Sequence, residues 1–333
     1  MMKDKSGIFI LTLTSFISVC LIICGTFYVS SDSTVFSKKQ SVSEYIISTS
    51  AEQSSNQSDL PPSVNASTEA DAVGKVIPQF ISPYKSKTSY NRVYIKNRAG
   101  IDLDIAKYLK AANHIKLQKN AEPQILIMHT HTTECYLLED RDYYTKKDLT
   151  RTRDKSYNVT AMGKIVADKL NSAGFTTLHD TTEHDYPSYN GSYNRSGETV
   201  KKYLQKYPSI KIVIDMHRDS LAGNGTDRVK PVIEINGKNA AQVMLVMGCG
   251  ETVANHENWE KNFAFAVKYQ QTMEALYPGL ARQLSLVSAR YNQYLTTGSI
   301  LLEVGTESNS LEEASYGAEL AATALISYLN TLT

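Results

Sequence analysis

The sequence predicts an α/β domain with a mostly parallel or mixed sheet and helices on both faces. From about residue 90 onward, short apolar runs typical of buried strands alternate with amphipathic helical patterns. Three of the apolar runs end in acid, base or metal-binding side chains. Functional residues of open α/β sheets gather just beyond the carboxyl ends of strands, so these ends are where we expect a site.

The N-terminal residues predict a membrane anchor. Lys3 and Lys5 precede an apolar stretch from Ile8 to about Val29. At about 1.5 Å per residue it is long enough to cross a hydrocarbon core of about 30 Å. The lysines predict a cytoplasmic N-terminus with the rest of the chain outside. "FYVSSDS" makes a poor cleavage site for a signal peptide, so we expect an uncleaved anchor in residues 1–30.

Residues 31–89 form a predicted extracytoplasmic stalk. This stretch is rich in Ser, Thr, Asn and Gln and shows no persistent periodic apolar pattern. Such a composition buries too little apolar surface to offset the entropy of ordering, so we expect a flexible tether. The remaining residues, 90–333, are then the catalytic domain.

Within that domain the elements follow in order. Strands are predicted at 123–129, 174–180, 211–217, 231–237, 242–248, 284–290 and 299–305. Helices are predicted at 158–174, 196–207, from 259 to just before Gly279, and at 310–329. Asn158 is the expected cap of the first helix and Gly174 its stop.

The three informative strand ends supply a set typical of metal-dependent hydrolases. "ILIM" is followed by His129, His131 and Glu134, "IVIDM" by His217, and "ILL" by Glu303. Two neutral imidazoles and a carboxylate are a common set of zinc (Zn²⁺) ligands, and a further carboxylate is the base that a metal hydrolase needs. The His131-x-x-Glu134 spacing favours His131 over His129 as the ligand, which leaves His129 as a supporting residue that donates to a ligand carboxylate.

Other residues near these motifs are candidate supporting or substrate-binding groups. Asp215 or Asp219 is expected to hold the second ring nitrogen of His217. Arg218 either binds a substrate carboxylate or pairs with Asp219. Cys135 is either a thiolate that reaches the metal or a small buried hydrophobe, and a Cys135–Cys249 disulfide is a weaker alternative. Asn309, beyond the third strand end, is a further candidate.

Composition excludes some classes. The net charge of the 333 residues is only +1, so no nucleic-acid surface is indicated. No glycine-rich phosphate loop and no Gly-x-Ser-x-Gly elbow is present, which argues against nucleotide-binding and serine-hydrolase classes.

Four motifs in order resemble the stage II sporulation protein P family. These are "ILIMHTHTTECY", "YNGSYNRSGETVKKYL", "IVIDMHRDS" and "ILLEVGTESNSLEEA", and the resemblance covers roughly residues 90–330. It implies the fold of zinc N-acetylmuramoyl-L-alanine amidases, of the phosphorylase/hydrolase-like type. Carried over, it implies zinc on His131, Glu134 and His217, with Glu303 catalytic. In ordinary amidases the ligand Glu lies further from the first His than Glu134 does, which sets Glu134 apart from the other three.

The resemblance also implies a substrate and a setting. Members cut the amide between muramic acid and L-alanine in peptidoglycan, can cleave peptide cross-links, and act in the sporulation septum during engulfment, on the mother-cell side. The implied partners are the stage II sporulation proteins D and M. Tyr and Asn residues of "SYNGSYNRS" are expected to line the substrate groove, with Arg195 binding a stem-peptide carboxylate. A zinc carboxypeptidase acting on stem peptides and a catalytically silent wall-binding scaffold are the two alternatives.

Overall fold

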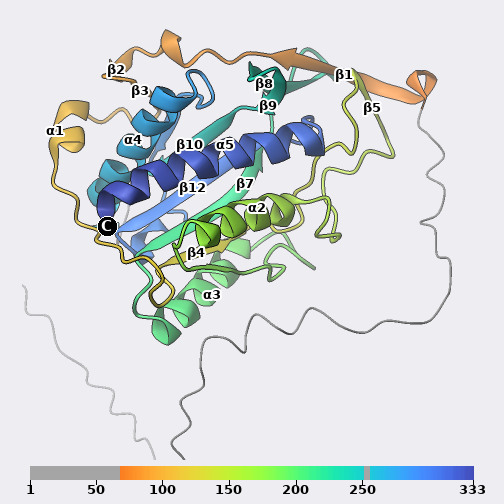
Figure 1. Ribbon diagram of the computed structural model, residues 1–333. Coiled ribbons are helices and arrows are strands. Elements are labelled where there is room, and N and C mark those ends of the chain that lie inside the picture. Colours follow the sequence, from red (N-terminus) through yellow and green to blue (C-terminus); the bar gives the residue numbers. More distant parts are fainter. Residues whose placement is uncertain (1–67, 251–255) are drawn as a thin grey trace, which may run out of the picture. The chain divides into compact units, whose positions relative to one another are not determined.

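An eight-stranded mixed sheet forms the centre of the computed structural model, which describes residues 68–250 and 256–333 (Figure 1). Its strand order is β2-β3-β11-β10-β12-β7-β4-β6. The strands are β2 (Thr88–Tyr90), β3 (Val93–Asn97), β11 (Leu284–Val287), β10 (Val243–Gly248), β12 (Gly298–Thr306), β7 (Ile212–Asp219), β4 (Ile125–Met128) and β6 (Thr177–His179). The four strands from β12 to β6 are parallel, whereas β10 runs antiparallel to β12. The predicted α/β class with a mixed sheet is confirmed.

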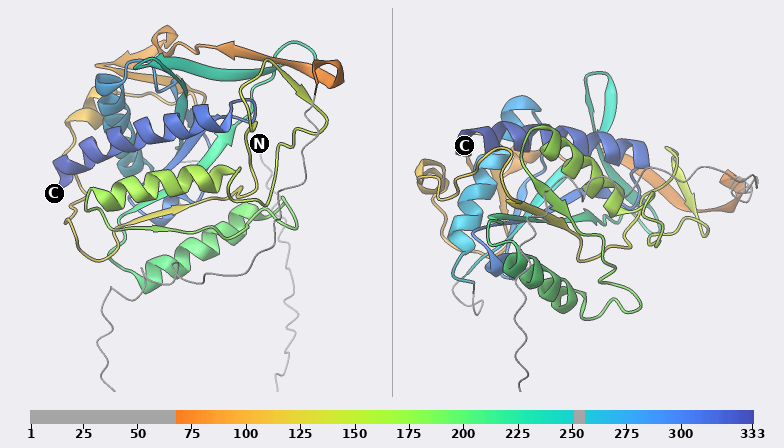
Figure 2. Two further views of the ribbon diagram at one scale, coloured as in Figure 1. Left: turned by 45° about the vertical axis from the view of Figure 1, so that its right-hand side comes forward. Right: turned by 60° about the horizontal axis from the view of Figure 1, so that its bottom comes forward.

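Helices cover both faces of this sheet. They are α1 (Ile105–Lys110), α2 (Val159–Ser172), α3 (Ser192–Lys206), α4 (Trp259–Leu276) and α5 (Leu311–Leu329). In the two views of Figure 2, α2 and α5 lie on one side of the strands and α3 on the other. The buried clusters agree, because Ile125 and Ile127 of β4 pack into the cluster that contains α2 and α5, whereas Leu126 and Met128 pack with Val200 of α3.

Local sequence signals explain where these helices begin and end. Asn158 caps α2 by accepting a hydrogen bond from Thr160 N, and Gly174 follows the helix with a left-handed φ of 84°. Ser310 and Glu313 form a capping box at the start of α5. Helix α3 begins at Ser192, four residues before the predicted start at 196, because "SYNR" continues the helix toward Gly191.

A second, four-stranded sheet corrects the predicted domain boundary. Its order is β5-β1-β8-β9, with β1 at Ala72–Gln79, β5 at Tyr143–Thr145, β8 at Arg228–Ile235 and β9 at Lys238–Ala241. Strand β1 lies inside the predicted stalk, yet it pairs with β8 and β5. Residues 72–89 therefore belong to the folded part, and the boundary at residue 90 was placed too late. The rest of the predicted stalk up to residue 67, and the anchor in residues 1–30, lie outside the described residues.

Among residues 68–250 and 256–333, none of the helices combines the length and the apolar character that crossing a membrane requires.

Strand alternation directs the chemistry to one face. In β7, Ile212, Ile214 and Met216 enter the cluster under α2 and α5. Side chains of a strand alternate between faces, so Asp215 and His217 point to the α3 side. Strand β12 repeats the pattern, and its Glu303 pairs in register with His217 of β7. The fold thus gathers these polar side chains on the α3 face, near the carboxyl ends of β4, β7 and β12.

Candidate functional site

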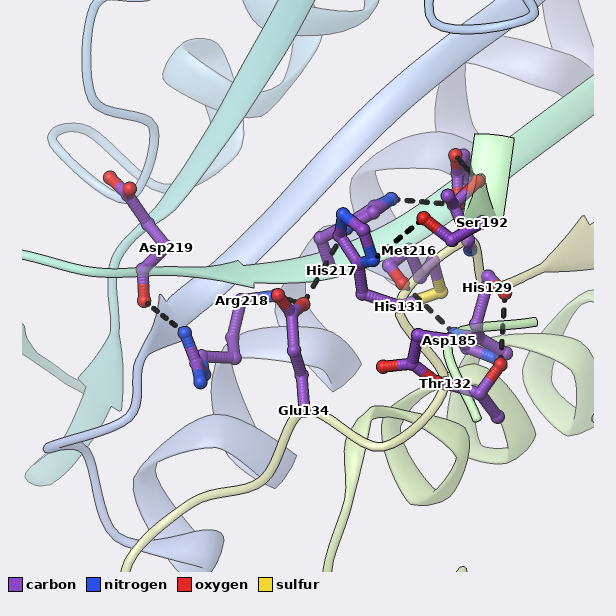
Figure 3. Close-up of polar contacts among 12 residues, drawn as sticks. His129, His131, Thr132, Glu134, Asp185, Ser192, Met216, His217, Arg218 and Asp219 are labelled. Carbon is purple, nitrogen blue, oxygen red and sulfur yellow. Dashed lines mark hydrogen bonds and ion pairs between the residues drawn. The ribbon is translucent and has the colours of Figure 1, made fainter. Parts of the chain in front are cut away.

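His131, Glu134 and His217 come together where β4 and β7 end (Figure 3). Glu134 Oε2 lies 3.5 Å from His217 Nδ1. The rings of His131 and His217 meet edge to face, with centroids 5.2 Å apart. All three side chains are buried, and Glu303 of the neighbouring strand lies opposite His217 in the β12–β7 register. The residues that the sequence singled out at three strand ends are neighbours in space.

Two pairwise spacings in this donor set are comparable with those around a tetrahedral zinc ion. Two ligands held at about 2.0–2.2 Å by one tetrahedral ion lie about 3.3–3.6 Å apart, which the 3.5 Å between Glu134 and His217 matches. Two imidazoles on such an ion have centroids about 5 Å apart, as His131 and His217 do. In the described part of the chain, no three His, Cys, Asp or Glu side chains already surround a common point.

The electrostatics of the site favour a cation. Burial opposes a charge on His217, but Asp215 and Glu134 outweigh it and raise the pKa of His217 well above its usual value. Burial alone would raise the pKa of Glu134. The contacts with His217 outweigh it and hold the pKa of that carboxyl below its usual value. Burial, with His217 nearby, lowers the pKa of His131 to about 4, so this imidazole is neutral at pH 7 and its lone pair is available.

Supporting contacts orient each of the three side chains. Asp215 Oδ1 lies 2.8 Å from His217 Nε2, at hydrogen-bonding distance although not in hydrogen-bonding direction. This carboxylate is itself fixed by the backbone N–H and the hydroxyl of Thr130, at 2.8 and 2.7 Å. Asp215, rather than the alternative Asp219, thus occupies the position beside the second nitrogen of His217.

Sequence reasoning missed Arg151, which contacts Glu134, and Asp185, which holds Arg151. Arg151 reaches Glu134 Oε1 at 3.4 Å and donates to Asp185 at 2.6 Å. Asp185 in turn accepts a hydrogen bond from the Thr133 hydroxyl at 2.7 Å. Arg151 and Asp185 come from loops with no spacing pattern relative to the His-x-x-Glu motif, so no sequence signal pointed to them.

Aromatic rings surround His131. Tyr189 stacks on it with centroids 4.4 Å apart, and Tyr193 meets it edge-on at 5.6 Å. Ser192 Oγ lies 3.4 Å from His131 Nδ1. All three residues belong to the "SYNGSYNRS" segment at the start of α3, which the sequence analysis expected to line a groove.

Glu303 carries an unusual buried carboxyl. Burial is the largest influence on it and raises its pKa to about 8, with Asp219 and Glu134 adding to the effect. Its Oε2 is buried and has no hydrogen-bond partner among the described residues. A buried carboxyl without a hydrogen-bond partner lowers the stability of a fold and therefore needs an explanation. A pKa near neutrality is what a general base needs.

His129 differs from its expected role. It was expected to donate to a ligand carboxylate, but its Nδ1 contacts the Met216 carbonyl at 2.9 Å and its Nε2 contacts His179 Nε2 at 2.9 Å. His184 in turn contacts the His129 carbonyl at 2.7 Å. His129 therefore holds β4 to β7 and to the β6 end, beneath the site rather than within it.

Arg195 and Arg218, which the sequence suggested as substrate-binding residues, contact backbone carbonyls of this chain. The Arg195 guanidinium donates to the carbonyls of His184, Ser188 and Asn190, which fixes the loop before α3. Arg218 is buried and donates to the carbonyls of Thr150 and Asp219. Both guanidinium groups are engaged by backbone.

Three further candidates also have structural partners. The Asp219 carboxylate pairs with Arg282 at 2.9 Å. Asn309 accepts from Thr306 N at 2.9 Å and shapes the turn after β12. The Cys135 thiol donates to the Leu149 carbonyl at 3.1 Å, and burial raises its pKa to about 11, which favours the small buried hydrophobe over the metal-binding thiolate. Cys135 and Cys249 are both free cysteines, so the disulfide alternative is wrong.

Solved structures of cell-wall amidases resemble this fold. The CwlD amidase from Clostridioides difficile, solved with the GerS lipoprotein, aligns over 62% of this chain and 99% of its own with 11% identity and a TM-score of 0.39. The amidase AmiC2 of Nostoc punctiforme aligns over 62% and 97% with 14% identity and a TM-score of 0.37. At these values the likeness carries no information on substrate.

Sequence comparison gives the closer relationship. Stage II sporulation protein P of Bacillus subtilis (strain 168) is 31% identical over 209 residues, which are 60% of this chain and 49% of that protein. The chain thus matches about half the length of this relative. The model of the family described as Stage II sporulation protein P (SpoIIP) matches residues 28–326. Because this family model matches most of the chain, the chain belongs to the Stage II sporulation protein P family.

Proposed function

We propose that this chain is a zinc-dependent peptidoglycan hydrolase that cleaves the N-acetylmuramoyl-L-alanine amide, with peptide cross-links as a second substrate of the same site. The observation that carries the proposal is the convergence of His131, Glu134 and His217 with the unpaired carboxyl of Glu303 at adjacent strand ends. Membership of the sporulation family supports the cell-wall substrate and a role during engulfment.

His131, Glu134 and His217 are the residues that would hold zinc. Zinc bound there supplies Lewis-acid polarisation of an amide carbonyl and acidifies water. Asp215 orients His217, since a carboxylate on the second nitrogen fixes which ring nitrogen faces the metal. Arg151 contacts Glu134 Oε1 and is itself held by Asp185, so this pair would orient the Glu134 carboxylate.

Glu303 is the proposed general base. Its carboxylate takes a proton from the attacking water, whose oxygen bonds to the amide carbon, and returns that proton to the nitrogen as the carbon–nitrogen bond breaks. A pKa raised to about 8 by burial suits a group that both accepts and returns a proton near neutral pH.

The family and the N-terminal sequence support a proposed setting. We place the catalytic domain outside the membrane, on the mother-cell side of the sporulation septum, tethered by an uncleaved single-pass anchor in residues 1–30. Its proposed partners are peptidoglycan and the stage II sporulation proteins D and M.

Site variants test this proposal. We expect His131→Ala and His217→Ala to lose bound zinc and muropeptide release together. Glu303→Gln should keep zinc while release falls by about 10²–10⁴-fold, the usual contribution of general acid–base catalysis. Zinc content is measured by elemental analysis and release by chromatography of digested peptidoglycan. His114→Ala, a change at an exposed histidine that contacts the Thr297 carbonyl, is the matched control. Full release by Glu303→Gln would refute the base, and unchanged zinc in the double histidine variant would refute the metal site.

Product analysis separates the two alternatives. A zinc carboxypeptidase also uses His-x-x-Glu, a distant His and a later Glu, but it shortens stem peptides without freeing them from glycan. Mass spectrometry of the products distinguishes free peptides from shortened ones. A silent scaffold would bind wall without releasing either, and the costly unpaired carboxyl of Glu303 argues against it.

A further inference from the structure

Seven exposed side chains form a basic and apolar surface beside the C-terminal end of α4, which we call the α4 patch. Its apolar members, each 45–49% exposed, are Phe80, Tyr84, Tyr90 and Leu276. Its basic members are the exposed side chains of Lys85, Lys87 and Arg92. Large apolar side chains that gather on a surface mark an interaction site. None of the seven belongs to the candidate site.

Contacts with the end of α4 gather the apolar members. The Tyr84 hydroxyl donates to Glu274 at 2.8 Å. The Phe80 ring borders Gly279, since a Cβ added to this glycine would lie 3.0 Å from Phe80 Cε2. Leu276 lies between these two positions in the chain. The three apolar side chains therefore surround one end of the helix.

The β2–β3 turn brings the rest of the α4 patch to the same helix. Gln271 of α4 donates to the carbonyl of Asn91 at 2.9 Å, and Asn91 lies between Tyr90 and Arg92 in the turn. Figure 1 shows β2 and β3 next to α4. The patch is thus one continuous region, although its members come from distant parts of the sequence.

The segment that supplies most of the patch is strongly basic. Residues 72–98 contain no aspartate or glutamate, and their six cations are all exposed. These cations are Lys75, Lys85, Lys87, Arg92, Lys96 and Arg98. The carboxylate that Tyr84 contacts, Glu274, is buried and also accepts from Gly279 N at 2.9 Å. The patch therefore presents positive charge around an apolar surface.

This combination fits the surface of an anionic membrane. Tyrosine is enriched at membrane–water interfaces, because its ring is apolar and its hydroxyl remains hydrated. Anionic headgroups attract lysine and arginine close to the membrane. Apolar side chains beside such cations enter the boundary between headgroups and acyl chains. A soluble polyanion would match the cations alone and leave the four apolar side chains in water.

We propose that the α4 patch binds anionic phospholipid headgroups of the membrane in which the chain is anchored. The cations contact the headgroup phosphates, and the apolar side chains insert between them. The inference rests on the proposed anchor in residues 1–30 and not on the proposed hydrolysis. Residues 31–67 join that anchor to the described part, which begins just before β1 and the patch. A tethered domain meets the membrane at a high effective concentration, so even weak contacts hold it there.

Hydrogen exchange of the full chain tests this surface. The chain is reconstituted through its anchor into nanodiscs of phosphatidylcholine, either alone or mixed with phosphatidylglycerol. We expect amide exchange in residues 80–92 to be at least threefold slower in the mixed discs. In the triple variant Lys85→Gln, Lys87→Gln and Arg92→Asn, exchange should be equal in the two discs. Asparagine suits position 92, where φ is 66° and the backbone is left-handed.

Two further variants separate the patch from net charge. The triple change Lys116→Gln, Lys146→Gln and Lys147→Gln removes the same charge from exposed lysines outside the patch and should keep the slower exchange. Leu276→Gln removes an apolar contact without changing the charge and should lose at least half of the slowing. Circular dichroism checks that each variant is folded.

Four results would overturn the assignment. Exchange could be equal in the two discs for the parent chain, or the patch variant could retain the slowing. The slowing could arise only with soluble poly(glycerol phosphate), which would assign the patch to an anionic polymer. A chain that does not enter the discs would refute the anchor and this assignment together. Muropeptide release is measured separately, so a chain with a protected patch and no release would refute the proposed hydrolysis and support the α4 patch.

Discussion

At the scale of single residues, Asp215 is the group that supports His217 in its proposed role as a zinc ligand. It lies 2.8 Å from His217 Nε2 and is anchored by two hydrogen bonds from Thr130. A carboxylate on the outer nitrogen raises the basicity of an imidazole and fixes its orientation, and loss of such a partner typically costs 10–100-fold in metal affinity.

We therefore expect Asp215→Asn to weaken zinc binding by about 10–100-fold while the fold is kept, because an amide oxygen can still accept from Thr130. Competition with a chromophoric chelator measures the affinity, and circular dichroism checks the fold. Asp219→Asn, which removes the charge that pairs with Arg282, is the matched change four residues on. Equal zinc affinity in the Asp215 and Asp219 variants would contradict the assignment of Asp215.

How much of the site could be predicted depends on where each residue lies. The proximity of His131, His217 and Glu303 could be predicted, because strand ends in an α/β sheet can be recognised from apolar runs and such ends lie together. Arg151 and Asp185 escaped because loops bring them in from outside any periodic pattern. The contacts of Arg195 could not be predicted either, because nothing in the sequence indicates that its guanidinium donates to three backbone carbonyls.

At the scale of elements, the long helices agree with their apolar periodicity and caps, and β1 marks the limit of that signal. Only Val76 of β1 is buried, so the strand has no alternating pattern to detect. Its place depends on backbone pairing with β8 and β5, far along the chain. A strand that contributes hydrogen bonds rather than a buried face looks like polar linker in sequence.

Helix α2 packs through Gly163 against His129 and His179, the histidine pair beneath the site. A Cβ at this position would lie 2.5 Å from His179 Nε2 and 2.6 Å from His129 Nε2. Alanine is favoured over glycine in a helix by about 1 kcal/mol. Overpacking a rigid core typically costs about 1–3 kcal/mol, and here the two contacts are with the buried ring of His129 and the partly buried ring of His179.

We expect Gly163→Ala to lower the free energy of unfolding by about 1–2 kcal/mol, since the clash outweighs the helix preference. Denaturant titration measures the change. Lys164→Ala, at the adjacent exposed position whose Nζ pairs with Asp168, should remain within about 0.5 kcal/mol of the parent. A Gly163→Ala chain more stable than the parent would show that α2 can shift away from the pair.

At the scale of the whole molecule, we expect the same pair, His129 and His179, to make the fold sensitive to acid. Burial lowers the pKa of His129 to about 3, with His179 adding to the effect, and burial lowers the pKa of His179 to about 4. In the unfolded chain both rings titrate near 6.5. The unfolded state therefore binds more protons than the folded state between about pH 4 and 6.5. The stabilisation from keeping these rings neutral is present above pH 6.5 and is lost as the pH falls through this window.

Removal of one ring should flatten that dependence. For His179→Gln, whose amide can still donate to His129, we expect the slope of unfolding free energy against pH between 6 and 5 to fall by about 1 kcal/mol per pH unit, close to one proton. Denaturant titrations at several pH values measure the slope. His114→Gln, at an exposed ring, should leave it unchanged. A His179→Gln slope equal to that of the parent would mean that His179 binds its proton equally in both states, and the acid sensitivity of the fold would then lie in other groups.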